Sequence, residues 1–274
     1  MSFILSAFAD EAASSLDEQI LAMKQNNIRF LEIRGVDGIN IADITPQKAV
    51  EIRKKTDDAS LGIWSLGSPF GKIGINEAFE PHLESFKRSI ENAHILGAKN
   101  IRIFSFYGAD SISPVLSRLE KFIEAAKGSG ITLCHENEKA IYGDTAPKCL
   151  EIHKALPELK AVFDPANFIQ CGQNVKDAWD MLSPYVCYMH IKDALADGSV
   201  VPAGKGIGNL EYLLGKYRGT VLTIEPHLSI FSGRDKLEAT PDAFLGKFIY
   251  PDNMTAFKAA TDALKEILNK IERT

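Results

Sequence analysis

The sequence has no long apolar run, no CxxC pair and no excess of positive charge. A membrane-spanning helix needs about 20 predominantly apolar residues in succession, and no run in the 274 residues approaches that length. The 31 lysines and arginines are outnumbered by 36 aspartates and glutamates, which gives a net charge of -5. That balance opposes the phosphate-backbone contacts of nucleic-acid binding. We therefore expect neither a membrane nor a nucleic acid as a partner.

The cysteines and the first residues favour a cytoplasmic protein. The four cysteines are widely spaced, and scattered thiols in a reducing compartment are usually small buried apolar groups. The segment MSFILSAFADEAASS has neither a basic region nor a long apolar region, so it does not resemble a secretory signal. The apolar fraction of 45% and the charged fraction of 24% are typical of globular proteins.

Short β-rich segments alternate with segments of helical periodicity along the whole chain. The eight strand candidates are FILSAF, RFLEIRG, GIWSLG, NIRIFSF, ITLCHE, KAVFD, YVCYMHI and TVLTIE. The helical segments include residues 15–26, 46–58, 80–96, 114–128, 145–155 and 252–272. Strict alternation implies a parallel sheet with crossover helices, and eight units in about 250 residues predict a closed (β/α)8 TIM barrel.

An open, doubly wound sheet is the alternative fold. In that fold a GxGxxG turn commonly follows the first strand, whereas ADEAASS stands there in this chain. No linker or change of composition divides the sequence, so we expect a single TIM-barrel domain over residues 1–274. The longest irregular stretches, residues 65–79 and 228–251, are then loops at the rim of the barrel.

Polar side chains follow four consecutive strands of the predicted barrel. These strands end in HENE (135–138), DPAN (164–167), HIKD (190–193) and EPH (225–227). The carboxyl ends of the strands form the mouth of a TIM barrel, where its active site lies. One acidic residue after a strand is most often a helix cap, but four metal-capable ends in register predict a shared site.

The candidate ligands are Glu136, Asp164, His190 and Glu225. Carboxylate oxygens and one imidazole suit one divalent ion, with Mn, Mg or Co preferred and Zn or Fe as alternatives. Three crowded carboxylates would repel one another without a dication. The structural alternative is that Asp164 and Asp193 cap helices and that His190 packs in the core.

The chain resembles the sugar phosphate isomerase/epimerase family of xylose isomerase-like TIM barrels. The similarity covers nearly the whole sequence, through the segments FADEAASSLDEQI, FLEIRGVDG, LGAKNIRIF, HENE, FDPANF, HIKD, GKGIG and IEPH. The resemblance implies that Glu136, Asp164, His190 and Glu225 bind the metal, and that Glu136 and Glu225 are the catalytic acid/base pair. It also implies a small sugar or sugar phosphate as substrate and a place in carbohydrate metabolism. A homo-oligomer stays open.

The sequence departs from the best-known members of the family at two positions. Ketose epimerases commonly have a histidine where this chain has Asn167, and a further glutamate where it has Tyr142. Endonuclease IV, a DNA-repair relative, needs more histidines for three zinc ions than the six in this chain can supply at the strand ends. The nuclease is therefore a distant alternative.

Proton transfer through an enediolate is the chemistry that this residue set predicts. A divalent ion stabilises the enediolate as a Lewis acid, and two carboxylates move the proton. A metal-dependent dehydratase or other lyase acting on a polyol or keto-inositol would use the same residues. A non-catalytic sugar-binding barrel is a further alternative.

Further rim residues are candidates for substrate binding, each with a structural alternative. Glu32, Arg34 and Lys192 would bind hydroxyl or phosphate oxygens, or form salt bridges. His227 lies two residues after Glu225 and so on the same side of an extended chain. The remaining candidates are Trp64 for an apolar wall, Asn167, and Lys205 in the glycine-rich GKGIG segment for a phosphate.

Overall fold

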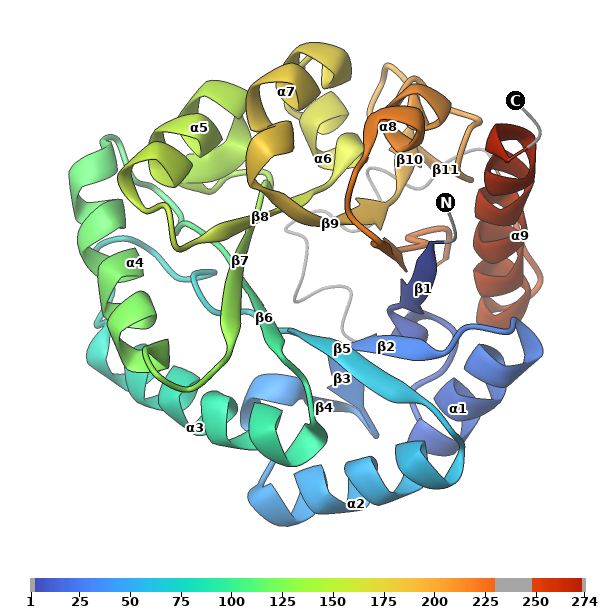
Figure 1. Cartoon of the computed structure of the whole chain (residues 1–274), viewed down its shortest axis with the longest axis horizontal. Helices are drawn as coiled ribbons and strands as arrows, with labels where there is room; N and C mark the ends of the chain where they lie inside the picture. The colour runs from blue at the N-terminus through green and yellow to red at the C-terminus, as the bar shows by residue number, and fades with distance from the viewer. Residues whose placement is uncertain (1–2, 230–247, 273–274) are drawn as a thin grey trace.

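The computed structural model describes residues 3–229 and 248–272, and it shows a ring of strands surrounded by helices (Figure 1). Eight parallel strands close a barrel in the order β1-β12-β9-β8-β7-β6-β5-β2. These strands are β1 (Ile4–Ala7), β2 (Phe30–Ile33), β5 (Gly62–Gly67), β6 (Asn100–Ile103), β7 (Thr132–Glu136), β8 (Lys160–Phe163), β9 (Val186–Ile191) and β12 (Val221–Ile224). The predicted TIM barrel is confirmed.

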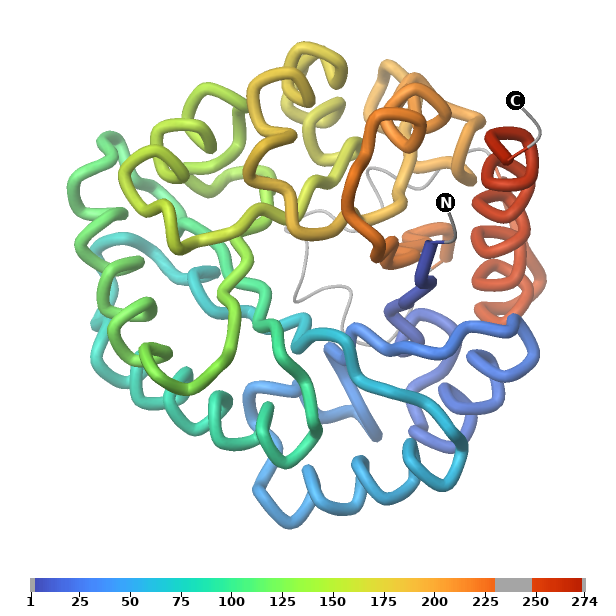
Figure 2. Tube along the Cα trace, in the orientation of Figure 1, coloured from blue at the N-terminus to red at the C-terminus, as the bar shows by residue number. Residues whose placement is uncertain are grey.

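The helices form the outer layer of the barrel, as the tube in Figure 2 also shows. They are α1 (Leu16–Gln25), α2 (Pro46–Asp58), α3 (Glu80–Leu96), α4 (Ile112–Ala126), α5 (Ala146–Ala155), α6 (Pro165–Gln170), α7 (Val175–Leu182), α8 (Leu210–Lys216) and α9 (Asn253–Ile271). Ser15, Thr45 and Asp252 start α1, α2 and α9 by accepting the N–H of the residue three positions later. Helix α9 contacts both α8 and α1, so it closes the ring (Figure 1).

Two small hairpins and four short 3-10 helices complete the described part of the chain. The hairpins are β3 (Gly35–Val36) with β4 (Ile39–Asn40), and β10 (Asp193–Ala194) with β11 (Val200–Val201). They follow β2 and β9 and therefore extend the mouth of the barrel. The 3-10 helices are η1 (Ala9–Glu11), η2 (Ile41–Asp43), η3 (Tyr142–Asp144) and η4 (Ser183–Tyr185). Among the described residues, no helix combines the length and apolarity that a membrane span requires.

The core has an outer layer between strands and helices and an inner cluster within the barrel. The alternation of side chains along each strand separates the two. The inner cluster consists of Cys134, Val162, Tyr188 and Val221, with Trp64 and Cys187 packed against it. Trp64 lies edge-on to Tyr188 with ring centroids 5.9 Å apart. Trp64 is partly buried and packs against this inner cluster rather than in a wall at the mouth, because it stands in the middle of β5 and not after its end.

Candidate metal centre

The four candidate ligands converge at the mouth of the barrel. Strands β7, β8, β9 and β12 are successive neighbours in the ring, and each contributes one of them at its carboxyl end. One ligand atom each from Glu136, Asp164, His190 and Glu225 lies within 4.8 Å of the others. All four residues are at most 3% exposed. His190 Nδ1 is 2.9 Å from Glu136 Oε1 and 3.3 Å from Glu225 Oε2.

Asp164 both caps a helix and faces the cluster. Its Oδ1 accepts the N–H of Asn167 at 2.9 Å, which starts α6. Its Oδ2 is 2.9 Å from Lys192 Nζ. Asp193, by contrast, does not cap a helix, because its carboxylate accepts four backbone N–H groups of the β10 region and the following glycine loop. The helix-cap alternative is thus partly right for Asp164 and wrong for Asp193.

Acidic groups outnumber fixed cations around this cluster. Arg34, Arg102 and Lys192 supply three positive charges within it. The surrounding carboxyl groups belong to Asp10, Glu11, Glu32, Glu136, Asp164 and Glu225. Oxygen donors with one imidazole and an excess of negative charge fit a hard or borderline divalent ion. The described residues therefore suit the expected metal.

Burial and neighbouring charges separate the proton affinities of the carboxyl groups. Burial raises the pKa of Asp164 to about 7 although Lys192 opposes the shift. Burial acts on Glu136 in the same direction, but His190 and Arg102 outweigh it and hold the pKa of Glu136 below its usual range. Lys192 and His227 likewise hold the pKa of Glu225 well below its usual range against burial. Glu136 and Glu225 are therefore ionised near neutral pH.

His190 is also affected by its carboxylate neighbours. Burial lowers the pKa of His190, but Glu136 and Glu32 together raise it well above its ordinary value. A histidine must be neutral at the nitrogen that binds a metal. Ion binding would therefore release a proton from His190 or its neighbours, and affinity for the ion would increase with pH.

Each of the three buried cations contacts a candidate ligand. Lys192 Nζ lies 3.1 Å from Glu225 Oε2, in addition to its contact with Asp164. Arg102 Nη1 donates to Glu136 Oε2 at 2.6 Å. Arg34 Nε donates to Asp10 at 2.8 Å, and its Nη1 is 3.5 Å from Glu225 Oε1. These contacts fix the orientation of the carboxylates.

The structure brings Arg34, Asn167, Lys192 and His227 beside the cluster. Asn167 Nδ2 donates to the carbonyl of Asn137 at 2.9 Å and lies 3.4 Å from Glu136 Oε1. The backbone N–H of His227 donates to Glu11 Oε2 at 2.6 Å, and its ring Nε2 is 3.7 Å from Glu225 Oε1. A φ of 45° places His227 in the left-handed region, which is strained for a residue with a side chain.

Two other predicted substrate contacts lie elsewhere. Glu32 is 0% exposed and lies under His190, so a substrate at the mouth would not reach it directly. Lys205 is exposed, and the N–H groups of Gly204, Gly206 and Gly208 all donate to Asp193. These three donors are used within the protein and do not form an open cradle for a phosphate.

Sequence reasoning missed Arg102, Asp10 and Glu11. Glu11 belongs to a second buried group with Glu225 and His227, in which ligand-type atoms lie within 4.8 Å of one another. Burial raises the pKa of Glu11 to about 7. The signal was present for two of them, because the first strand runs into Asp10 and Glu11 in FADE.

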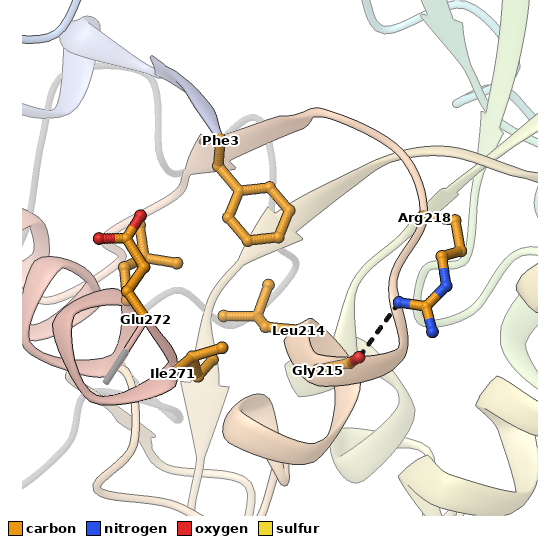
Figure 3. Close-up of a pocket in the computed structure, with 7 residues that line it drawn as sticks. Phe3, Leu214, Gly215, Arg218, Ile271 and Glu272 are labelled. Atoms are coloured by element: carbon orange, nitrogen blue, oxygen red, sulfur yellow. Dashed lines mark hydrogen bonds between the residues drawn. The ribbon is translucent and has the colours of Figure 1, made fainter. Parts of the chain in front are cut away.

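Two described cavities lie away from this centre. One, of about 190 Å³, is lined by Phe3 of the amino-terminal segment together with Leu214, Arg218 and Ile271 (Figure 3). The other, of about 400 Å³, lies between the end of α4 and the start of β7. Neither is lined by any of the four candidate ligands.

Comparison with known proteins identifies the family. Residues 20–240 match the family described as xylose isomerase-like TIM barrel. The chain belongs to this family. The uncharacterized protein YihM of Escherichia coli (strain K12) is 23% identical over 221 residues, which are 79% of this chain and 63% of YihM. The chain thus spans less than two thirds of that relative.

Solved structures of the same fold include enzymes of more than one kind. The probable 3-DHS dehydratase AsbF of Bacillus anthracis is 16% identical with a TM-score of 0.73, over 97% of this chain and 99% of that one. An L-ribulose 3-epimerase is 18% identical with a TM-score of 0.73, over 100% and 96% of the two chains. The IOLI protein, solved with a zinc atom, is 15% identical with a TM-score of 0.72, over 97% and 98%.

Proposed function

We propose that this protein is a divalent-metal-dependent isomerase or epimerase of a small sugar or sugar phosphate. The observation that carries the proposal is the convergence of Glu136, Asp164, His190 and Glu225 in one buried cluster at the barrel mouth. Two of its carboxylates are held ionised, as a proton-abstracting base requires. The likeness to a ribulose epimerase agrees with this assignment.

The residues of the centre take distinct roles in this proposal. All four would hold Mn, Mg or Co, and the bound ion would act as a Lewis acid on substrate oxygens. Glu136 and Glu225, at the carboxyl ends of strands β7 and β12, take and return the proton at the carbon beside the carbonyl. Arg102 keeps Glu136 ionised through its hydrogen bond to Oε2. Asn167 and Lys192 lie close enough to the pair to bind substrate hydroxyls.

A dehydratase is the second candidate function. The observation that favours it is the similar fold of a probable 3-DHS dehydratase, which matches 97% of this chain. Loss of water lowers the mass of the product by ~18 Da, whereas isomerisation does not change it. Mass spectrometry of the product separates the two functions.

Proton exchange in deuterated water tests the proposed function. Ketoses, aldoses and inositol derivatives are screened with Mn, Mg, Co and Zn supplied separately. Turnover is expected to place deuterium beside the carbonyl, and Glu225→Gln should slow exchange by ~100-fold or more while the protein still holds metal. Glu91→Gln, an exposed change on α3, is the matched control. A metal-loaded Glu225→Gln protein that exchanges at the wild-type rate would remove this residue from the mechanism.

A further inference from the structure

The two ring nitrogens of His190 face different groups. Nδ1 faces the other candidate metal ligands, where it lies 2.9 Å from Glu136 Oε1. Nε2 points the other way and lies 3.1 Å from Glu32 Oε2. His190 and Glu32 are both 0% exposed, so water does not compete for this contact. The imidazole is thus held between the cluster and a carboxylate beneath it.

Glu32 is itself held in place from below. The hydroxyl of Tyr188 donates to Glu32 Oε1 at 2.7 Å. Ser65 Oγ lies 3.3 Å from the same hydroxyl. Tyr188 is two residues before His190 on β9, so both side chains point into the barrel. The result is a buried chain of contacts from Ser65 through Tyr188 and Glu32 to His190.

We propose that Glu32 is a positioning residue of the metal centre, which acts through His190 and is itself oriented by Tyr188. A neutral imidazole carries one N–H, and a carboxylate can only accept it. Glu32 therefore keeps the proton on Nε2 and leaves the lone pair of Nδ1 directed at the ion. Carboxylates in this position raise the basicity of the ligand and fix the orientation of its ring. The inference rests on the metal site of the proposed function.

This role replaces the expectation that Glu32 binds substrate. One oxygen of Glu32 contacts Tyr188 and the other contacts His190. Tyr188 precedes His190 along β9, so Glu32 is contacted by a residue farther from the mouth than the ligand is. Glu32 therefore affects the reaction by determining how His190 meets the ion.

The affinity of Glu32→Gln for Zn and Mn tests the proposal. It is measured by letting the protein compete with a chromogenic chelator for each metal. Glutamine is isosteric, but its amide can donate to Nε2 and so permits the tautomer with the proton on Nδ1. We expect affinity to fall about 10- to 100-fold. In a His190→Ala background the same change should cause no further loss, because Glu32 then has no ligand to orient. If Glu32 had a purely structural role, Glu32→Gln would weaken metal binding equally in the wild-type and His190→Ala backgrounds.

A spectroscopic measurement reports the tautomer directly. Nitrogen-15 NMR of the zinc-loaded protein should show the His190 proton on Nε2, and there are only six histidines to assign. Thr223→Val is the matched control, because Thr223 pairs with His190 in the strand register and is 0% exposed. Its hydroxyl has no hydrogen-bond partner among the described residues. We expect Thr223→Val to keep wild-type affinity and the wild-type tautomer.

Tyr188→Phe keeps the proposal testable if Glu32→Gln does not fold. This change leaves Glu32 in place but removes the hydroxyl that orients it, so a smaller loss of affinity in the same direction is expected. Wild-type affinity and tautomer in every folded variant of Glu32 and Tyr188 would overturn the proposal. A wild-type protein that binds no divalent metal would overturn it together with the proposed function. A protein that binds metal but converts no sugar would overturn the proposed function alone.

Discussion

The two halves of the barrel interior stand on the same strands but have opposite chemistry. Toward the amino ends of the strands, the interior is filled by the cluster of Cys134, Val162, Tyr188 and Val221. The four candidate ligands occupy inward positions farther along the same chain segments. They stand two residues after Cys134, Val162 and Tyr188, and four residues after Val221. All of these positions are buried, so burial alone does not distinguish the halves.

The difference shows how little sequence separates packing from chemistry in this fold. Side chains alternate across a strand, and one step of two residues along the same face leads from an apolar layer to a charged one. The apolar half stabilises the barrel through close packing. The charged half contains more acids than fixed cations, so its stability depends on a proton or a bound ion. Changes of charge should therefore have unequal consequences in the two halves.

Introducing a charge into the apolar half is expected to have the largest effect. Val221→Asp places a carboxylate where the inner cluster supplies apolar neighbours, and an uncompensated buried charge costs about 3–5 kcal/mol. Glu225→Gln, four residues away on the same face, removes one charge where acids are in excess. Because Lys192 and Arg34 then lose a partner, the variant should still lower the free energy of unfolding of the metal-free protein, but by less than Val221→Asp does. Urea denaturation followed by circular dichroism measures both.

Similar losses of stability in Val221→Asp and Glu225→Gln would contradict the contrast between the two halves of the barrel interior. Val221→Ala separates the charge from the loss of apolar volume, since it removes only methyl groups. That control should cost about 1–2 kcal/mol and thus less than Val221→Asp. Equal costs for Val221→Ala and Val221→Asp would show that water or a cation reaches the lower half.

The barrel and its longer helices were predictable because their patterns are local. The predicted helices 46–58 and 80–96 coincide with α2 and α3. Helices α6 and α7, with six and eight residues, are too short for a clear period of 3.6 residues. The expected rim loop 228–251 extends into residues 230–247, which lie outside the described part of the chain.

The candidate ligands were predictable because each lies at the carboxyl end of a strand, whereas their supporting contacts were not. Arg102 stands inside a strand, where an inward-facing charge cannot be told from an outward-facing one until the sheet closes. The contact of Glu32 with His190 joins residues 158 positions apart. No local pattern records such pairs, and Glu32 was for this reason expected to bind substrate.

Lys192→Met should alter metal affinity by an intermediate amount. The ammonium contacts Asp164 at 2.9 Å and Glu225 at 3.1 Å, so an incoming ion competes with it for both carboxylates. Removing this competitor should tighten metal binding about tenfold, which corresponds to about 1.4 kcal/mol. The metal-free variant should melt at a lower temperature than metal-free wild type, because two buried carboxylates lose a counter-ion. Isothermal titration and differential scanning calorimetry provide the two values.

The Lys192 prediction has a conservative control in Lys192→Arg. Arginine keeps the positive charge, so its affinity for metal should remain closer to that of wild type than to that of Lys192→Met. Weaker metal binding by Lys192→Met would mean that the ammonium assists the ion rather than competing with it.

The smallest expected effect is a pH dependence confined to the charged half. Burial raises the pKa of Glu11 from 4.5 to about 7, so between these pH values the folded protein holds a proton that the unfolded chain has released. The free energy of unfolding therefore falls as pH rises through this window. Glu11→Gln removes this contribution, so metal-free Glu11→Gln should gain on wild type by about 1 kcal/mol between pH 5 and pH 6. Glu91→Gln, exposed on α3, should show no such gain. A difference in the free energy of unfolding between Glu11→Gln and wild type that stays constant across this range would mean that Glu11 stays ionised in the fold.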